Sequence, residues 1–168
     1  EAPDRTERLL GQRDALMADI LSHIVRHEPG RVLVFAHNRH LQLGPATWQL
    51  GPTLLKWWPA GAHLRQELGT AYVVAGGGLF DSPENGIGEP EPDTLEARLG
   101  QRREAAYVLP TQAGDSPGAA IKGLPTRSGS SRNTTYMPLN AESLTDFDWL
   151  AFVRTTAYAG GGPALPCC

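Results

Sequence analysis

The stretch RVLVFAHNRHLQLG, residues 31–44, restricts the fold of this chain more than any other part of the sequence. Val32 to Ala36 form a continuous apolar run with β-branched residues, and a run without alternation is typical of a strand covered on both faces, as in parallel sheets. Residues 4–28 precede it with apolar residues at three-to-four spacing, which predicts a helix that Pro29 and Gly30 end. Helix, tight turn and buried strand together predict an α/β fold, with a largely parallel sheet flanked by helices.

The other expected elements follow from the same periodicities. We expect short helices over residues 61–68 and 94–101, and buried strands over residues 71–75, 107–109 and 149–153. Prolines and glycines break regular structure, so residues 41–60 are predicted to form an irregular loop and residues 76–78 a turn. Residues 161–168 are expected to be a disordered tail, and residues 1–160 to belong to one domain.

Charge and hydropathy argue against several classes of partner. The net charge of -3 gives no electrostatic reason to expect nucleic acid or an anionic membrane as a partner. No apolar stretch approaches the roughly 20 residues that a membrane-spanning helix needs. Cys167 and Cys168 are adjacent at the C-terminus and cannot cross-link a fold, which fits a reducing compartment. We therefore expect a cytoplasmic protein.

The polar residues His37, Asn38 and His40, which follow the predicted strand directly, are the candidate catalytic residues. Open α/β sheets bind ligands outside the carboxyl ends of their strands. An imidazole titrates near neutral pH, so either histidine can take a proton from water and return it to a leaving group. Asn38 can orient a histidine or donate to an oxyanion. Two imidazoles can also chelate a metal, but no further ligand has a suitable spacing, so we expect no metal or other cofactor.

Three tryptophans, Trp48, Trp57 and Trp58, supply large rigid apolar surface in the segment 41–60. A long aromatic loop in a compact domain is often a binding wall, so these residues are candidates for contact with a substrate. The alternative is that the segment packs on the core as an Ω-loop. For Arg13 and Asp14 we expect an ion pair that ties the first helix to a loop, without a catalytic role.

Several of these segments together resemble the erythromycin esterase family over most of residues 7–156. In that family a helix that begins Arg-Asp and contains Met-Ala leads into an apolar strand that ends in Ala-His-Asn-x-His. A Gly-x-x-Leu helix and a second strand then follow. The matching residues are Arg13, Asp14, Met17, Ala18, Ala36, His37, Asn38, His40, Gly61 and Leu64.

The resemblance implies hydrolysis of an ester, in the best-known members the lactone of macrolide antibiotics, with a histidine as general base on water. By position, His37 is the first candidate for that base, His40 the second and Asn38 a supporting residue. The expected partner is a small-molecule ester or macrolide-like substrate. No G-x-S-x-G nucleophile elbow is present, which agrees with water activation rather than a serine nucleophile.

One part of the family pattern has no counterpart here, a Gly-Glu-x-His element from the N-terminal half of the domain. We therefore expect this chain to be a C-terminal portion of a longer hydrolase, whose N-terminal half would be a further partner. Two alternatives stay open. The chain is a non-catalytic binding module or an inactive fragment that lacks the Glu/His cluster, or it is a metal hydrolase that uses His37 and His40.

Overall fold

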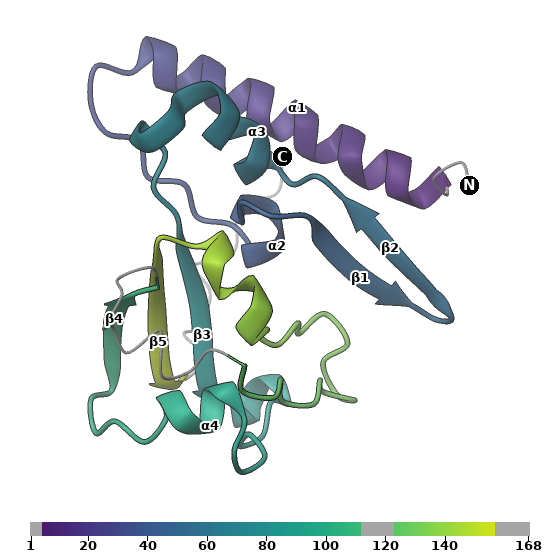
Figure 1. Ribbon diagram of the computed structural model, residues 1–168, viewed down its shortest axis with the longest axis vertical. Coiled ribbons are helices and arrows are strands. Elements are labelled where there is room, and N and C mark those ends of the chain that lie inside the picture. The colour runs from purple at the N-terminus through teal and green to yellow at the C-terminus, as the bar shows by residue number, and fades with distance from the viewer. Residues whose placement is uncertain (1–4, 112–122, 157–168) are drawn as a thin grey trace, which may run out of the picture.

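The computed structural model describes residues 5–111 and 123–156, and it shows helices and two small sheets in a mixed α/β arrangement (Figure 1). The helix α1 lies across one end with α3 and the hairpin β1–β2, and the three-stranded sheet extends away from it with α4 at its far end. The elements are α1 (Arg5–His27), α2 (Asn38–Leu41), β1 (Ala46–Leu50), β2 (Thr53–Trp57), α3 (Ala60–Leu68), η1 (Gly69–Ala71), β3 (Ala75–Asp81), η2 (Pro83–Asn85), α4 (Leu95–Leu99), β4 (Ala106–Pro110), η3 (Ala141–Asp146) and β5 (Trp149–Thr155).

The long first helix is confirmed, although only part of its apolar stripe faces the rest of the described chain. Its buried residues are Asp14, Ala18 and Ser22, whose spacing of four places them on one face. Ala18 packs with Ala60 and Leu64 of α3 in a small core cluster. Small residues on both helices allow this close approach, and Met17 and Leu21 of α1 pack against the same cluster, while Leu9, Leu16 and Ile20 point outward.

The apolar segment that was predicted to be a buried strand, residues 32–36, is extended but belongs to no sheet. Leu33 is 95% exposed and Phe35 is fully exposed at 100%. Within the described ranges, residues 31–36 make no backbone hydrogen bond. The prediction of a strand is wrong for this structure. An apolar pattern indicates that a segment is covered, but it does not tell which part of the chain covers it.

The segment 41–60, predicted to be an irregular loop, contains the antiparallel hairpin β1–β2. Leu50 pairs with Thr53, so Gly51 and Pro52 form a two-residue connection. Gly51 has a φ of 57°, which two-residue hairpin turns require and glycine adopts without strain. The turn residues that suggested a loop therefore connect two strands.

The sheet is mixed rather than largely parallel. Its strand order is β3-β5-β4, with β3 parallel and β4 antiparallel to the central strand β5. The strands expected over 107–109 and 149–153 are confirmed as β4 and β5. The expectation of a largely parallel sheet fails because residues 32–36 add no strand, and because β4 approaches β5 from the opposite direction.

The three glycines 76–78, expected to form a turn, lie inside β3. A Cβ atom at Gly76 would lie 2.8 Å from Cγ of Phe147, and one at Gly78 would lie 2.5 Å from Cδ1 of Leu139. These glycines allow the core side chains to pack directly against the strand backbone. The strand expected over 71–75 lies further toward the C-terminus, at Ala75–Asp81. The main core consists of Val74, Leu95, Leu99, Leu109, Leu139, Ala141, Leu144, Phe147, Leu150 and Phe152.

The two shorter helices are confirmed with small changes in their bounds. α3 occupies residues 60–68, and α4 occupies residues 95–99 with Thr94 as its N-cap. In the part of the chain that the structure describes, no helix is long and apolar enough to cross a membrane. The expected tail 161–168, with both cysteines, lies outside the described residues.

Candidate functional site

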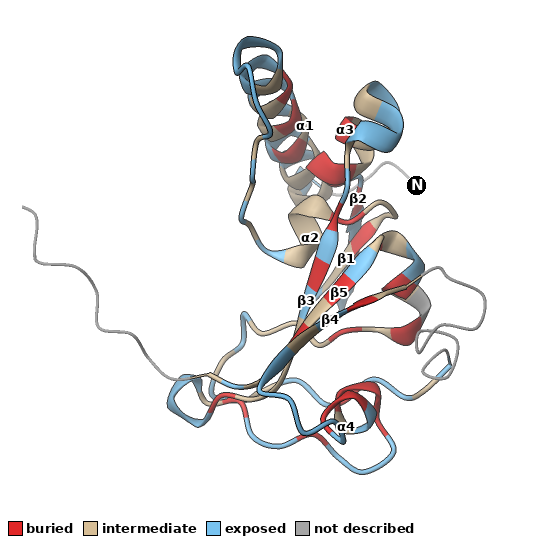
Figure 2. Ribbon diagram, turned by 90° about the vertical axis from the view of Figure 1, so that its left-hand side faces the viewer, coloured by how far each residue is buried: buried red, intermediate tan, exposed pale blue. Residues whose placement is uncertain are grey.

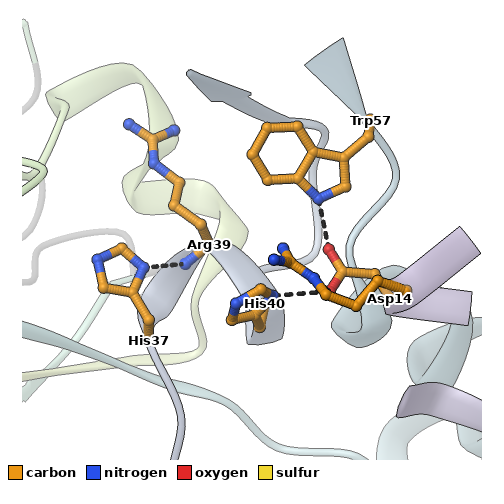
Figure 3. Close-up of polar contacts among 6 residues, drawn as sticks. Asp14, His37, Arg39, His40 and Trp57 are labelled. Carbon is orange, nitrogen blue, oxygen red and sulfur yellow. Dashed lines mark hydrogen bonds and ion pairs between the residues drawn. The ribbon is translucent and has the colours of Figure 1, made fainter. Parts of the chain in front are cut away.

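The candidate catalytic residues lie on and just before the short helix α2. His37 is the N-cap of this helix: its backbone is extended, and its Nδ1 accepts a hydrogen bond of 3.2 Å from the backbone N–H of Arg39. The cap turns the extended segment 31–37 into a helical turn. As a result His37, Arg39 and His40 project in different directions from one element (Figure 3).

Asn38 fixes α2 to the sheet. Its Nδ2 donates to the Gly77 carbonyl oxygen at 2.7 Å, and its Oδ1 accepts from the Gly77 N–H at 2.9 Å. The side-chain amide therefore pairs with β3 as a neighbouring strand would. Asn38, a candidate catalytic residue from sequence, is committed to the backbone, so its observed contacts position α2.

His40 forms the most complete side-chain network of the site (Figure 3). Its Nδ1 lies 2.7 Å from Oδ1 of Asp14 in α1, and Oδ2 of the same carboxylate accepts from the indole Nε1–H of Trp57. Asp14 is fully buried, and the His40 side chain is 23% exposed. A carboxylate only accepts, so Nδ1 of His40 carries a proton, and the neutral ring then has its lone pair on Nε2.

His37 has the opposite arrangement of donor and acceptor. Because its Nδ1 accepts from the Arg39 backbone, the neutral ring carries its proton on Nε2. Desolvation lowers the pKa of His37 from the ordinary value of 6.5, and the neighbouring His40 and Arg39 lower it further. The lowered pKa favours the neutral ring, whose exposed Nε2–H is a hydrogen-bond donor rather than a base.

Arg39 brings a cation beside the histidines. Its Nη1 lies 3.4 Å from Oγ1 of Thr47. Desolvation lowers the pKa of Arg39, and the Asp146 carboxyl opposes that shift. Desolvation also raises the pKa of Asp146, while a backbone hydrogen bond from Gly44 and the charge of Arg39 act in the other direction. The side of α2 that carries Arg39 therefore combines partly buried groups of both signs.

The C-terminal end of α2 is supported from two sides. The Tyr72 hydroxyl donates to the Leu41 carbonyl oxygen at 2.7 Å. The buried side chain of Gln42 donates to the carbonyls of Gly44 and Pro45. α3 approaches so closely that a Cβ atom on Gly61 would collide with the Leu41 carbonyl oxygen. These contacts hold the histidines on a rigid support.

The three tryptophans do not form one wall. Trp57 is 6% exposed and donates to Asp14, whereas Trp58 is 58% exposed. Both line an open hollow of about 380 Å³ between α1 and β2, and Trp48 does not line it. A second hollow of about 350 Å³ lies between α1 and α3. Neither hollow is lined by His37 or His40.

Sequence reasoning underestimated one residue of the site, Asp14. It was expected to pair with a loop as an ion pair without a catalytic role, but it lies against His40 and Trp57. A signal was present in the sequence: Asp14, Ala18 and Ser22 share one helical face, and a carboxylate beside small residues indicates a close polar contact. Arg13 lies 3.7 Å from the same carboxylate.

Within the described ranges 5–111 and 123–156, no three histidine, cysteine or acidic side chains form a group that could hold a metal ion.

The family match for erythromycin esterase covers residues 1–156 of the chain. The chain belongs to the erythromycin esterase family. The motif residues that suggested this resemblance are thus part of a match that spans most of the sequence.

A solved crystal structure of a Bacillus cereus protein is similar in fold, with a TM-score of 0.62 and 17% sequence identity. The similarity covers 92% of this chain and 40% of the Bacillus cereus chain, so this chain spans less than half the length of that protein. No curated protein is similar enough to this chain to count as a match.

Proposed function

We propose that this chain supplies the histidine–aspartate pair of an ester or lactone hydrolase, with His40 as the general base on water. The observation that carries the proposal is the 2.7 Å contact between His40 Nδ1 and Asp14 Oδ1. A base needs a free lone pair, and this contact leaves one on Nε2. The buried carboxylate also stabilises the imidazolium ion that forms when His40 takes a proton.

The reaction then follows from the two tautomers. Nε2 of His40 removes a proton from water, and the hydroxide adds to the carbonyl carbon of the ester. The carbonyl oxygen becomes an oxyanion, and a substrate that reaches both rings places this oxygen against Nε2–H of His37. When the carbon–oxygen bond to the leaving group breaks, the alkoxide takes the proton back from His40. Carboxylic acid and alcohol are the products, and both histidines return to their starting states.

His37 is thus assigned a different role from the one its sequence position suggested. A side chain that already accepts through Nδ1 has no free lone pair in the neutral state. Its lowered pKa also makes it a weaker base than an ordinary histidine. Arg39, on the same helix, supplies positive charge that stabilises the developing oxyanion.

The substrate class we propose is a carboxylic ester, and within it the lactone of a macrolide, which would give the chain a role in antibiotic resistance. Family membership supports the ester. The exposed Trp58 beside the hollow of about 380 Å³ offers apolar surface for a bulky substrate, although that hollow is separate from the histidines.

The test is hydrolysis of p-nitrophenyl acetate and of a macrolide lactone by two proteins: the 168-residue chain, and the same chain extended by any in-frame sequence upstream of Glu1. We expect hydrolysis that His40→Ala abolishes and that His37→Gln, which keeps a donor, largely preserves. Hydrolysis that is unaffected by His40→Ala would contradict the proposal. Absence of hydrolysis above background in both proteins would also contradict it and would favour a binding module.

A further inference from the structure

The extended segment 31–36 presents one face that nothing in the described chain covers. Exposure alternates along it: Arg31, Leu33 and Phe35 are exposed, and the residues between them are half-buried. Side chains of an extended chain alternate between two faces, so Leu33 and Phe35 lie on the same face. An aromatic ring and a branched aliphatic chain, both almost fully exposed, form a feature typical of a contact surface.

The backbone of the same segment is also unpaired. Residues 31–36 make no backbone hydrogen bond within the described ranges. Figure 2 shows the segment as a separate strip between the end of α1 and α2, coloured as exposed and intermediate. Unpaired N–H and C=O groups along an extended chain are a template for another strand.

A second open edge lies beside it on β3. The strand pairs with β5 on one side, and on the other side the Asn38 amide takes both backbone groups of Gly77. Asn38 thus ends the open edge at the point where the segment 31–37 reaches the sheet. Val73, which precedes β3, is 62% exposed. Within the described ranges, residues 31–36 therefore lack a strand partner, and β3 lacks one on the side that Asn38 contacts.

The long helix adds a further uncovered apolar surface. Leu9, Leu16 and Ile20 are 54%, 62% and 60% exposed, and their spacing of seven and four residues places them on one face of α1. This face is opposed to the one that packs on α3. An interface that covered it would bury the part of the predicted apolar stripe that α3 leaves exposed.

We propose that residues 31–36 are a docking strand that pairs with an extended apolar segment from a further part of an erythromycin-esterase-family domain on the same polypeptide. The choice of partner rests on length: the chain spans only 40% of the similar Bacillus cereus chain while 92% of its own length is matched. The partner strand supplies backbone donors and acceptors to residues 31–36, and its domain covers Leu33, Phe35 and the outer face of α1. This inference concerns assembly and is independent of the hydrolytic role.

Hydrogen exchange tests the pairing directly, because it reports backbone hydrogen bonds and needs no substrate. The two proteins to compare are the 168-residue chain and the same chain extended by any in-frame sequence that flanks it in its gene. We expect the amides of Val32, Val34 and Ala36 to exchange rapidly in the shorter chain and at least about 100-fold more slowly in the longer one.

Two variants separate docking from general stability. Phe35→Asp should leave the urea midpoint of the 168-residue chain unchanged, since the ring touches nothing there, and should lower both the midpoint and the amide protection of the extended chain. Leu54→Asp is the matched control, because Leu54 is 60% exposed on the hairpin, and it should change neither protein.

Several results would overturn the proposal. One is a gene with no in-frame coding sequence beyond these 168 residues. A second is equal exchange of residues 32–36 in both proteins. A third is a 168-residue chain that sediments as a dimer with these amides already protected, since a second copy would then be the partner. Failure of hydrolysis would leave this test unaffected.

Discussion

Asp14 and His40 are the residues on which the proposed chemistry depends. Removal of the imidazole in His40→Ala should lower kcat for ester hydrolysis by about 10²–10⁴-fold, the usual contribution of a general base. The variant should fold, since the His40 side chain is partly exposed and has one side-chain partner. Steady-state kinetics with p-nitrophenyl acetate measure this change, and a His37→Ala protein that loses more activity than His40→Ala would contradict the assignment.

Asp14→Asn tests the carboxylate itself. Asp14 accepts from two donors, His40 Nδ1–H and Trp57 Nε1–H, but an asparagine has one carbonyl oxygen and must turn its NH₂ toward one of them. A buried donor without an acceptor should cost about 1–3 kcal/mol of unfolding free energy. Urea titration measures the loss.

The matched control for Asp14→Asn is Trp57→Phe, which removes one donor and leaves the carboxylate with His40. We expect Trp57→Phe to keep the pH dependence of hydrolysis, with a loss of stability from the missing hydrogen bond. If Trp57→Phe instead raised KM without a loss of stability, Trp57 would be a substrate contact as its sequence position suggested.

The N-cap role of His37 predicts a dependence of stability on pH. Its pKa is lowered in the folded state, whereas the unfolded chain has the ordinary value of 6.5. Between these two values the unfolded state binds more protons, so stability should fall as the pH drops below 6.5. Protonation at Nδ1 also removes the acceptor that caps α2.

His37→Asn should remove this part of the pH dependence, because asparagine is a good N-cap that does not titrate. Urea midpoints at pH 7.5 and pH 5 measure the effect in both proteins. An equal fall in midpoint for the two proteins would show that His37 does not supply the pH dependence.

The short helix α2 depends on elements that are distant in sequence. Gly61 of α3 lies directly against the Leu41 carbonyl oxygen. Gly61→Ala should therefore displace α2 or α3, at a cost of about 1–3 kcal/mol, which is typical of overpacking. Gly30→Ala is the control, since a Cβ there meets nothing within 4 Å. Thermal unfolding of the two variants measures the difference, and equal midpoints would contradict the close packing.

Asn38 provides a second test at the level of the element. In Asn38→Asp the side-chain shape is retained, but a carboxylate oxygen then faces the Gly77 carbonyl oxygen where the amide donated. We expect a loss of stability at neutral pH that is partly recovered on acidification, because a protonated carboxyl donates again. Urea midpoints at pH 7 and pH 4, compared with those of Asn38→Ala, measure it. A variant that is as stable as the parent at pH 7 would contradict the anchoring role.

The elements that the sequence predicted well are those defined by local signals. α1 and α3 have helical spacing with breakers after them, and β4 and β5 are short apolar runs between polar segments. The glycines of β3 were misassigned because glycine marks turns by its backbone freedom, whereas here it makes room for Phe147 and Leu139. These contacts join Gly76 to Phe147 and Gly78 to Leu139, residues 71 and 61 positions apart, and no local pattern reports them.

The candidate site was predicted in part for the same reason. The positions of His37 and His40 were found from a strand-end motif, but their different tautomers depend on Asp14 in another helix and on a cap within α2. Residues 32–36 show the remaining difficulty. Their apolar pattern predicts burial, and burial requires a partner that the described chain does not supply.

The whole molecule combines a well-supported candidate site on α2 with uncovered surface around it. α2 is held by Asn38, Tyr72 and Gly61, while the segment that leads into it exposes Leu33 and Phe35. If docking orders this segment, it also restricts the freedom of His37, which directly follows it. Addition of the partner part should therefore raise kcat of ester hydrolysis more than it lowers KM.

The proposed roles require that the neutral His40 ring has its lone pair on Nε2, whereas the neutral His37 ring carries its proton there. Long-range proton–nitrogen NMR correlation of the imidazole rings at pH 7.5 measures both tautomers in the 168-residue chain, with His37→Ala and His40→Ala for assignment. We expect a proton on Nδ1 of His40 and on Nε2 of His37. The reverse pair of tautomers would contradict it, since His37 would then hold the available base.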